Sequence, residues 1–494
     1  MASHVSSKAK QQTWSDRGSA AIDAGDLAKA EQCFREAIRA DRRNAQHHFH
    51  LALVLEARAK FGPAAEHLTQ ALRLDPSQAD AARRLTTLIS RRPIPADVAL
   101  DPAGMRAALQ HDSSASWLIV KLALHALTAK GPLAATMDVG KREGWAQAAR
   151  TLCLTRTADA LRNELFLEIL RSDILRDADM EYLLTAVRGA LLLEVPAARF
   201  QDRDLMRFAI ALMQQCRANE YCWYVSEAEE ARLAIEAPSL PAVLDGDVNA
   251  SRKLLLSLLY RSFRATLGES ALPDAFAKVR PKALRDAVRD CLAEDCDLRA
   301  RAQSIPQLGV ISDAVSLKVA RQYEDNPYPR WISLRRPAQG EERKRLATFF
   351  KPSRLAFMDA PHNVLIAGCG TGHQAVYWAL NSPHARVTAV DLSLSALAYA
   401  SKMAERYATK NIEFQQADIQ QLPATPGFAA RFHIIECLGV LHHMANPFGG
   451  WRALLDCLAP EGKLLLGLYS ATARRVVSAL KADPAFPGPG CDDS

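Results

Sequence analysis

Apolar and polar positions follow two different patterns along this chain, and the change falls near residue 361. Residues 95–310 place apolar side chains at helical spacing, for example in 158–170 and 254–263, with proline and glycine breaks between these stretches. After residue 361, short apolar runs alternate with helical segments. Strands are predicted at Asn363–Ala367, Arg386–Val390, Asn411–Gln415, Phe432–Glu436 and Lys463–Leu468, and helices at Ala375–Leu380, Ser395–Tyr407, Phe448–Leu458 and Ala471–Lys481. Strands separated by helices of this length predict a parallel sheet with right-handed crossovers.

The N-terminal region contains a pattern that recurs after 34 residues. The matched positions are Trp14, Gly18, Ala30, Phe34 and Ala37, then His48, Ala52, Ala64, Leu68 and Ala71, followed by Pro76. An ordinary helical bundle would explain the amphipathic helices but not the shared period. The pattern resembles the tetratricopeptide repeat in two copies, covered by a helix at Ala79–Ile89. The resemblance implies a protein partner bound by the repeats. Because two copies are few for independent stability, we expect them to be stabilised by packing against the helical region after them.

A glycine-rich loop follows the first predicted strand of the α/β region. The run Val364-Leu365-Ile366-Ala367-Gly368-Cys369-Gly370-Thr371-Gly372 passes from an apolar strand into three alternate glycines and then into a helix. Glycines remove Cβ atoms where a ligand lies against the backbone, and the helix start offers free N–H groups and a positive dipole end. The loop therefore predicts a nucleotide-like ligand.

Two carboxylates follow the next two predicted strands. Asp391 ends the second strand, where it can accept hydrogen bonds from ribose hydroxyls, and Asp418 follows the third, where it can accept from an adenine amino group. The loop alone also fits a dinucleotide-binding pattern with Ala375 in third place, so a nicotinamide enzyme is an alternative. Asp418, together with Leu458-Ala459-Pro460-Glu461-Gly462 before the fifth strand, favours a class I methyltransferase.

Residues 210–480 resemble the bacterial tetratricopeptide-containing S-adenosylmethionine methyltransferases. The resemblance rests on Asn219-Glu220-Tyr221, on Gln322-Tyr323-Glu324-Asp325-Asn326-Pro327-Tyr328-Pro329-Arg330-Trp331, on the glycine loop, and on Gly467-Leu468-Tyr469-Ser470 with Ala473-Arg474. It implies S-adenosyl-L-methionine as cofactor, with contacts from Gly368, Gly370, Gly372, Asp391, Leu392, Asp418, Ile419 and Glu436. Many class I enzymes carry an acid two residues before the first glycine to contact the methionine ammonium, and Ile366 stands there in this chain.

The fourth predicted strand leads into two histidines. In similar small-molecule methyltransferases the run Glu436-Cys437-Leu438-Gly439-Val440-Leu441-His442-His443 faces both cofactor and acceptor. His443 or His442 is therefore a candidate to remove a proton from the acceptor nucleophile. The alternative is that one histidine hydrogen-bonds backbone and shapes the pocket, because methyl transfer often needs only alignment.

Residues 321–360 form a segment rich in proline and aromatic residues. Asn326-Pro327-Tyr328-Pro329 differs by one residue from the Asn-Pro-Pro-Tyr loop of some methyltransferases and does not follow the fourth strand. We interpret it as a rigid segment whose Tyr323, Tyr328 and Trp331 pack over the cofactor mouth and exclude water. A structural hinge to the helical region is the alternative.

The C-terminal end departs from a complete class I sheet of seven strands. Only 26 residues follow Leu468, and Asp483–Ser494 is too rich in proline and glycine for a buried strand. We therefore expect a domain that lacks its last strands, through a shortened gene or because another element covers the exposed fifth strand.

Composition and charge narrow the classes of function that this chain can have. A hydrophobic content of 49% and a charged content of 24% are ordinary for a globular protein. The net charge of +7 without a concentrated basic stripe argues against nucleic-acid binding. The ten cysteines show no zinc spacing, so we expect no metal, and the polar N-terminus and short apolar runs predict a cytoplasmic protein without a membrane span.

The predicted organisation is multidomain: an all-α part followed by a Rossmann-like α/β domain. Its parts are repeats at 10–92, a helical middle region at 95–320, the linker at 321–360, the methyltransferase domain at 361–482 and a disordered tail at 483–494. The main functional hypothesis is methyl transfer to an unidentified small-molecule or protein acceptor. The alternative is a scaffold whose methyltransferase-like domain binds cofactor without turnover.

Overall fold

A computed structural model describes residues 14–483, apart from 96–97, 112–114, 156–157, 269–271, 312, 314–315, 319–323, 325–326, 328–329 and 337–338. The chain divides into two compact units. A helical unit comprises Met1–Cys296 and Pro329–Arg336, and an α/β unit comprises Asp297–Tyr328 and Pro337–Ser494. The division falls earlier than the predicted boundary at residue 320.

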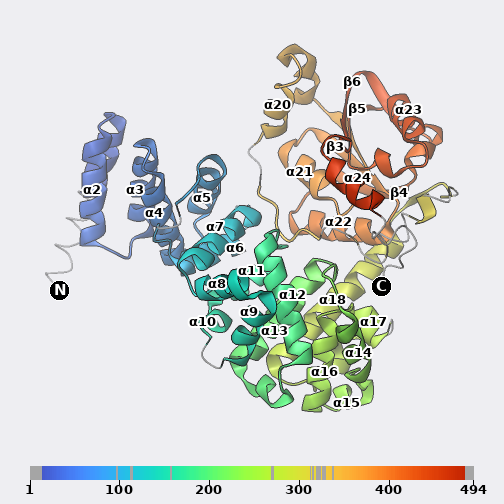
Figure 1. The fold of residues 1–494 in the computed structure, drawn as a ribbon. Helices are drawn as coiled ribbons and strands as arrows, with labels where there is room; N and C mark the ends of the chain where they lie inside the picture. The colour runs from blue at the N-terminus through green and yellow to red at the C-terminus, as the bar shows by residue number, and fades with distance from the viewer. Residues whose placement is uncertain are drawn as a thin grey trace. The chain divides into compact units, whose positions relative to one another are not determined.

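The first helices of the helical unit recur at the predicted offset. After a helix at residues 14–23 come α2 (Leu27–Ala40), α3 (Ala45–Ala57), α4 (Phe61–Leu74) and α5 (Ala79–Arg91), which lie side by side in Figure 1. Helices α2 and α4 begin 34 residues apart, at 27 and 61. They bury matching side chains, all 0% exposed: Ala30, Phe34 and Ala37 in α2, and Ala64, Leu68 and Ala71 in α4. A Cβ on Gly18 would lie 2.8 Å from the ring of Phe34, so the small residue lets the paired helices approach.

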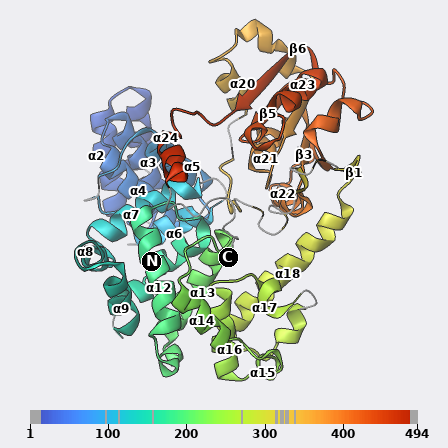
Figure 2. The same ribbon diagram turned by 45° about the vertical axis from the view of Figure 1, so that its right-hand side comes forward.

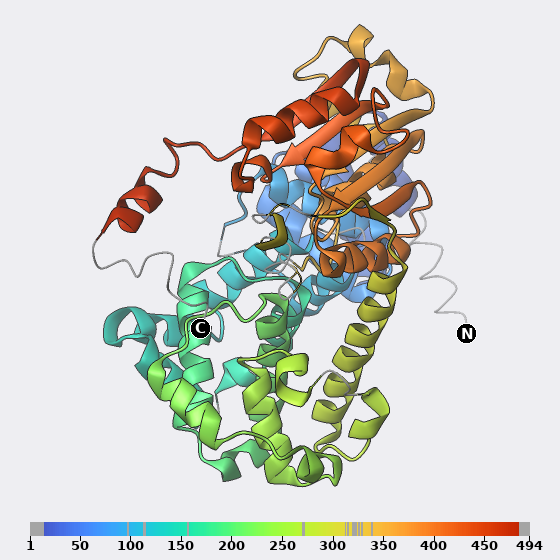
Figure 3. The ribbon, with the colours of Figure 1, turned by 90° about the vertical axis from the view of Figure 1, so that its right-hand side faces the viewer.

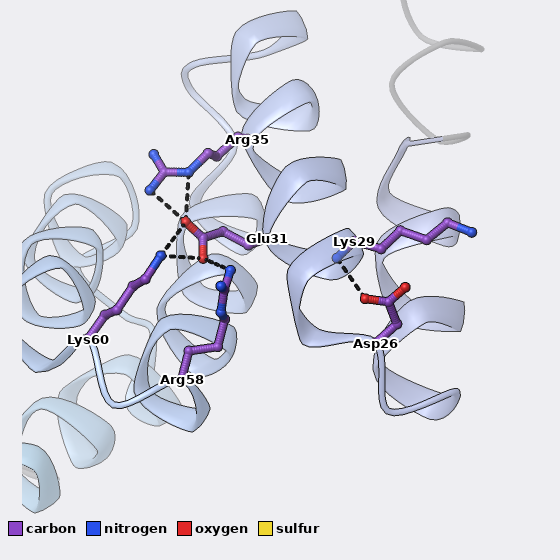
Figure 4. Close-up of polar contacts among 6 residues, drawn as sticks. All are labelled: Asp26, Lys29, Glu31, Arg35, Arg58 and Lys60. Carbon is purple, nitrogen blue, oxygen red and sulfur yellow. Dashed lines mark hydrogen bonds and ion pairs between the residues drawn. The ribbon is translucent and has the colours of Figure 1, made fainter.

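A buried carboxylate ties α2 to the turn between α3 and α4. Glu31 accepts hydrogen bonds from Arg35 at 3.0 Å, from Lys60 at 2.9 Å and from Arg58 at 2.5 Å (Figure 4). Burial alone would raise the pKa of Glu31, but the bonds from Lys60 and Arg35 lower it overall. Because one anion holds cations from two helix pairs, it fixes the stacking of the pairs.

The remaining helices continue the same core. One cluster of buried apolar side chains runs from Ala21 to Leu292, so the repeat-like helices and the helical middle region share one core, as expected for an array that leans on the helical region after it. The helices are α6 (Pro102–Gln110), α7 (Ser116–Ala129), α8 (Ala134–Glu143), α9 (Trp145–Leu154), α10 (Asp159–Arg162), α11 (Glu164–Ser172), α12 (Ala178–Leu193), η1 (Ala197–Gln201), α13 (Arg203–Ala218), α14 (Glu227–Ile235), α15 (Leu240–Leu244), α16 (Val248–Leu258), α17 (Phe263–Leu267), η2 (Pro273–Phe276) and the long α18 (Lys282–Ser304; Figure 2).

The α/β unit contains a parallel sheet in the order β1-β4-β3-β2-β5-β6. The strands are β1 (Gln307–Leu308), β2 (His362–Ala367), β3 (Ala385–Asp391), β4 (Ile412–Ala417), β5 (Phe432–Leu438) and β6 (Leu458–Gly467). The helices between them are α20 (Glu341–Leu346), η3 (Pro352–Asp359), α21 (His373–Asn381), α22 (Leu394–Arg406), η4 (Ile419–Ala424), η5 (Leu441–His443) and α23 (Pro447–Cys457), and α24 (Arg475–Ala482) follows β6. The predicted parallel sheet is therefore confirmed, and its order places β3 and β2 at the centre, flanked by β4 and β5.

Apolar side chains on both faces of the sheet are covered by helices. On one face, α20, η3 and α21 bury Leu346, Leu355 and Trp378 against β2 and β3. On the other face, η4 and α23 pack on β5 through Leu422 and Leu454. Coverage on both faces explains why these strands are continuous apolar runs rather than alternating ones.

Three elements differ from the sequence expectations. Strand β1 lies in the stretch predicted to be all-helical and pairs with β4, where Leu308 is the partner of Ala417. Strand β6 begins five residues before the predicted start at 463, and its register to β5 shifts between Phe432 and Ile434. Helix α24 begins at residue 475 rather than 471, has no buried residue and is set apart from the sheet in Figure 3.

Among the described residues, no single helix is long and apolar enough to cross a bilayer. Helices α7 and α8 are together long and apolar enough, but the chain bends by 75° between them.

Candidate cofactor site

The glycine loop joins β2 to α21 at the carboxyl edge of the sheet. Gly368, Gly370 and Gly372 have φ of 69°, 51° and 81°, a left-handed conformation that favours glycine. A Cβ on Gly368 would lie 2.4 Å from Val440, and one on Gly372 would lie 2.4 Å from the Cβ of Ala400. A Cβ on Gly370 would meet no atom within 4 Å. Gly368 and Gly372 therefore allow close packing of the protein itself, while Gly370 borders open space.

Asp391 fastens this loop to the end of the neighbouring strand β3. Its Oδ2 accepts the N–H of Gly370 at 2.7 Å and its Oδ1 accepts the N–H of Ser393 at 3.0 Å. Burial raises the pKa of Asp391 above its usual range, the N–H donors oppose this rise, and the nearby Glu324 adds to it. The strand end thus presents a partly covered carboxylate beside the open side of Gly370.

The next strand end carries Asp418 and Ile419. Asp418 is 3% exposed and its Oδ1 accepts the N–H of Gln420 at 3.0 Å, which caps η4. The side chain of Ile419 is 6% exposed and belongs to the apolar cluster under η4. The backbone of Leu392 is held by β4, because Gln416 Nε2 donates to its carbonyl at 2.7 Å. Since β2, β3 and β4 are parallel neighbours, Gly370, Asp391 and Asp418 lie at one edge of the sheet.

Glu436 occupies the position across from Ile366. The two residues are register partners on β5 and β2, so their side chains leave the same face of the sheet. Glu436 is 1% exposed, and its carboxylate accepts hydrogen bonds from Arg345 of α20 and, at 2.8 Å, from Gln374 of α21. Arg345 also donates to Glu342 at 2.6 Å and keeps 38% of its side chain exposed. A buried carboxylate with a solvent-reaching cation thus stands beside the first turn of α21.

Glu324 is a site residue that the sequence reasoning named without a role. Its Oε1 accepts the N–H of Leu394 at 2.6 Å, and its Oε2 accepts the N–H and hydroxyl of Ser395 at 3.0 and 2.5 Å. The carboxylate therefore caps α22 next to Asp391. The signal present in the sequence was its place in the run from Gln322 to Trp331 that carried the family resemblance.

The two candidate histidines differ in their surroundings. His443 is exposed in the short η5 turn after β5, whereas the ring of His442 lies 3.6 Å from that of Tyr469, centroid to centroid. The Arg474 guanidinium lies 4.0 Å from the centre of the Tyr469 ring. Among the described residues neither ring nitrogen of His442 has a hydrogen-bond partner, and burial, His443 and Arg474 lower the pKa of His442. At neutral pH His442 is therefore an uncharged ring enclosed by aromatic neighbours.

The predicted cover of the cofactor mouth by the aromatic segment after residue 321 stays a prediction. Trp331 is 6% exposed and belongs to the helical unit, while Tyr323 and Tyr328 lie outside the described residues. Arg330 forms an ion pair with Glu220, and both side chains are largely buried. Glu220 of the run Asn219-Glu220-Tyr221 and Arg330 of the run ending in Trp331 therefore meet inside the helical unit.

Comparisons with known proteins place the matching region on this site. Residues 364–462 match the family described as a methyltransferase domain. The chain is 33% identical over 176 residues to an uncharacterized protein of Synechococcus sp., covering 34% of this chain and 40% of that protein. It is 26% identical over 134 residues to the ubiquinone biosynthesis O-methyltransferase of Marinobacter nauticus, covering 26% of this chain and 55% of that protein.

Among solved structures, the YcgJ protein of Bacillus subtilis shares 26% identity at a TM-score of 0.22, covering 26% of this chain and 56% of that chain. The chain thus spans about half the length of these relatives. The matched segment runs from the glycine loop to β6, which is the part that carries the carboxyl edge described above. For this segment, the prediction of a methyltransferase domain is confirmed.

Proposed function

We propose that this chain is an S-adenosylmethionine-dependent methyltransferase that transfers the methyl group to an O, N or C nucleophile by in-line displacement. The observation that supports it best is the carboxyl edge of β2, β3 and β4, where the open side of Gly370 adjoins the carboxylate of Asp391. The residues fit an adenosine there, because bare backbone leaves room and carboxylates can accept from hydroxyl and amino groups.

In this proposal each strand end binds a different part of the cofactor. Asp391 accepts from the ribose hydroxyls, and Asp418 with Ile419 and the backbone at Leu392 borders the adenine. Bound S-adenosylmethionine supplies an activated methyl group on a sulfonium centre. The contribution of the chain is alignment of that centre with the acceptor and exclusion of water.

The amino-acid end of the cofactor is assigned to Arg345 and Glu436. A zwitterion carries one carboxylate and one ammonium, and this site holds one guanidinium and one carboxylate that pair with each other. We infer that the cofactor carboxylate binds Arg345 and its ammonium binds Glu436, which takes the role of the acid absent at Ile366. Because the buried carboxylate of Glu436 exchanges the guanidinium of Arg345 for the ammonium, it is not left unpaired.

The acceptor is assigned to the end of β5. His443 is exposed in η5 and is free to reach an acceptor proton, whereas the enclosed His442 shapes the pocket wall against Tyr469. A neutral histidine here serves as the base only if the acceptor nucleophile arrives protonated.

The decisive experiment has two stages on the full chain. Calorimetry measures binding of S-adenosylmethionine, and a methyl-labelled cofactor is then incubated with bacterial lysate to detect label transfer. Binding with transfer supports the proposal, and binding without transfer supports the scaffold alternative. If neither S-adenosylmethionine nor S-adenosylhomocysteine binds, the proposal is wrong, and binding of NADH instead would indicate an oxidoreductase.

We further propose that residues 14–91 are two tetratricopeptide repeats with a covering helix that bind a protein partner. The support is the offset of 34 residues between α2 and α4 and their matching buried side chains. Affinity capture by the intact chain and by a Phe34→Asp variant, with both checked for folding by circular dichroism, tests this assignment. A partner retained equally by a folded variant would refute it.

A further inference from the structure

A large cavity lies in the helical unit, formed by residues outside the methyltransferase match. Its volume is about 1610 Å³, and it is lined by η1, the first turn of α13, the turn before α16 and residues 277–285, where α18 begins. Seven of the lining side chains are Arg or Lys and two are Asp. The cavity therefore has the electrostatic character of an anion site.

Four of these cations are neutralised by carboxylates. The ion pairs are Arg207–Glu164 at 2.6 Å, Arg252–Glu236 at 2.8 Å, Lys278–Asp245 at 3.6 Å and Arg285–Asp286 at 3.5 Å. The second lining aspartate, Asp247, caps α16 by accepting the N–H of Ala250 at 2.6 Å. Both acids of the lining are thus engaged locally.

Three cations of the lining remain. Within the described part of the chain, Arg203, Arg280 and Lys282 form no ion pair with a carboxylate, and all three are exposed. They come from two elements, because Arg203 is the first residue of α13 while Arg280 and Lys282 flank the start of α18. Helix α18 has 23 residues and no acid in its first turn, so its dipole adds positive potential at the same place.

The lining also indicates what kind of anion fits. Phe200 is its one aromatic residue, is 3% exposed, and has the guanidinium of Arg252 lying 5.8 Å from its ring centre. Single-stranded nucleic acids are held by exposed aromatic faces along an extended groove, and this lining presents no exposed aromatic face. Three unmatched cations in one concavity instead suit a compact ligand with adjacent phosphates, which guanidinium groups bind in a bidentate manner.

We propose that this cavity binds a small-molecule polyphosphate through Arg203, Arg280 and Lys282. The ligand is defined by two or more adjacent phosphate groups, whether inorganic or part of a nucleoside polyphosphate. Since the cavity lies in the helical unit, this binding does not depend on the methyl-transfer proposal.

The test is calorimetry of the full chain with inorganic tripolyphosphate and, separately, with ATP. The triple variant R203Q/R280Q/K282Q removes the unmatched charges. The control R42Q/R43Q/R91Q removes three exposed arginines elsewhere in the same unit, so both variants change the net charge equally. Wild type and control should bind tripolyphosphate alike, and the triple variant should bind it at least about tenfold more weakly.

Three outcomes would overturn the proposal. These are equal weakening in the control, unchanged binding in the triple variant, or tighter binding of an oligonucleotide than of tripolyphosphate. Should the triple variant unfold, the single Lys282→Gln variant, changed at an exposed position, decides the result. Tighter binding of ATP than of tripolyphosphate identifies the nucleoside form as the source of the phosphates, and the reverse identifies the inorganic form.

Discussion

Substituting alanine at each loop glycine should separate cofactor binding from stability. All three glycines have positive φ, so each substitution carries a backbone cost of about 1–2 kcal/mol. At Gly370 this backbone cost is the whole expected loss of folding free energy, because the new methyl group meets no protein atom within 4 Å. Its methyl group instead projects into the space proposed for the cofactor.

Alanine at Gly368 or Gly372 should instead mainly lower the stability of the fold. At Gly372 the methyl would lie 2.4 Å from the Cβ of Ala400 and 3.0 Å from its Cα, far inside an ordinary contact of about 3.5–4 Å, and backbone cannot rotate away. Overpacking then adds about 1–3 kcal/mol to the loss of stability. At Gly368 the obstacle is the side chain of Val440, which can rotate, so the added cost should be smaller.

Thermal unfolding and calorimetry with S-adenosylhomocysteine together measure both effects. We expect Gly370→Ala to lower the affinity at least about tenfold, which is about 1.4 kcal/mol, with the smallest fall in unfolding temperature of the three. We expect Gly372→Ala to show the largest fall in unfolding temperature. Wild-type affinity in Gly370→Ala would refute the placement of the cofactor beside this loop.

Individual side chains support three further predictions. Glu436→Gln and Arg345→Met should weaken the binding of S-adenosylhomocysteine measured by calorimetry. They should leave the affinity for 5′-methylthioadenosine unchanged, because that analogue lacks the amino-acid end. Equal losses of affinity for both ligands would contradict the assignment. Burial raises the pKa of Asp391 and only its ionised form accepts two ribose donors, so affinity for S-adenosylhomocysteine should fall on acidification at a higher pH than an ordinary aspartate would cause, and this fall should be absent in Asp391→Asn. Burial lowers the pKa of His67 from 6.5 to about 4. Its neutral form therefore stabilises the fold above pH 6.5, and that contribution is lost as the pH falls toward 4. Unfolding temperatures measured against pH should show this loss in wild type and less of it in His67→Gln.

The sequence predicted those features whose signals are local. A strand of five or more apolar residues followed by alternate glycines is visible in one short window, and so are acids that follow strands. Strand β1 gave no such signal, because two residues carry no periodicity and its partner β4 lies more than a hundred residues later. The early start of β6 was hidden because its first residues include Pro460 and Gly462, which read as a turn, and because Glu461 takes a positive φ of 62° within the strand.

The ion pair between Arg330 and Glu220 gave no signal in the sequence. Arg330 lies beside Trp331, which was predicted to pack over the cofactor mouth from a rigid, proline-fixed segment. Burial raises the pKa of Glu220 even though Arg330 opposes this. A pair separated by 110 positions depends on how the helices of the unit pack, which a single sequence does not encode locally.

In the proposed site, Glu436 replaces a missing motif residue from a neighbouring strand. Sequence reasoning about the ammonium contact is confined to the loop itself, where Ile366 offers no charge. In a parallel sheet, however, the register partner on the next strand presents its side chain to the same face, and at this position that partner is Glu436. An isolated carboxylate that is 1% exposed would destabilise the fold through lost hydration. The hydrogen bonds from Arg345 and Gln374 offset this loss in the absence of ligand. Because Arg345 reaches solvent while Glu436 does not, an incoming amino acid can contact the guanidinium first and displace it from the carboxylate second. The exchange requires only that the Arg345 side chain shift toward the ligand, and Arg345 keeps a second carboxylate partner, Glu342, on the same helix.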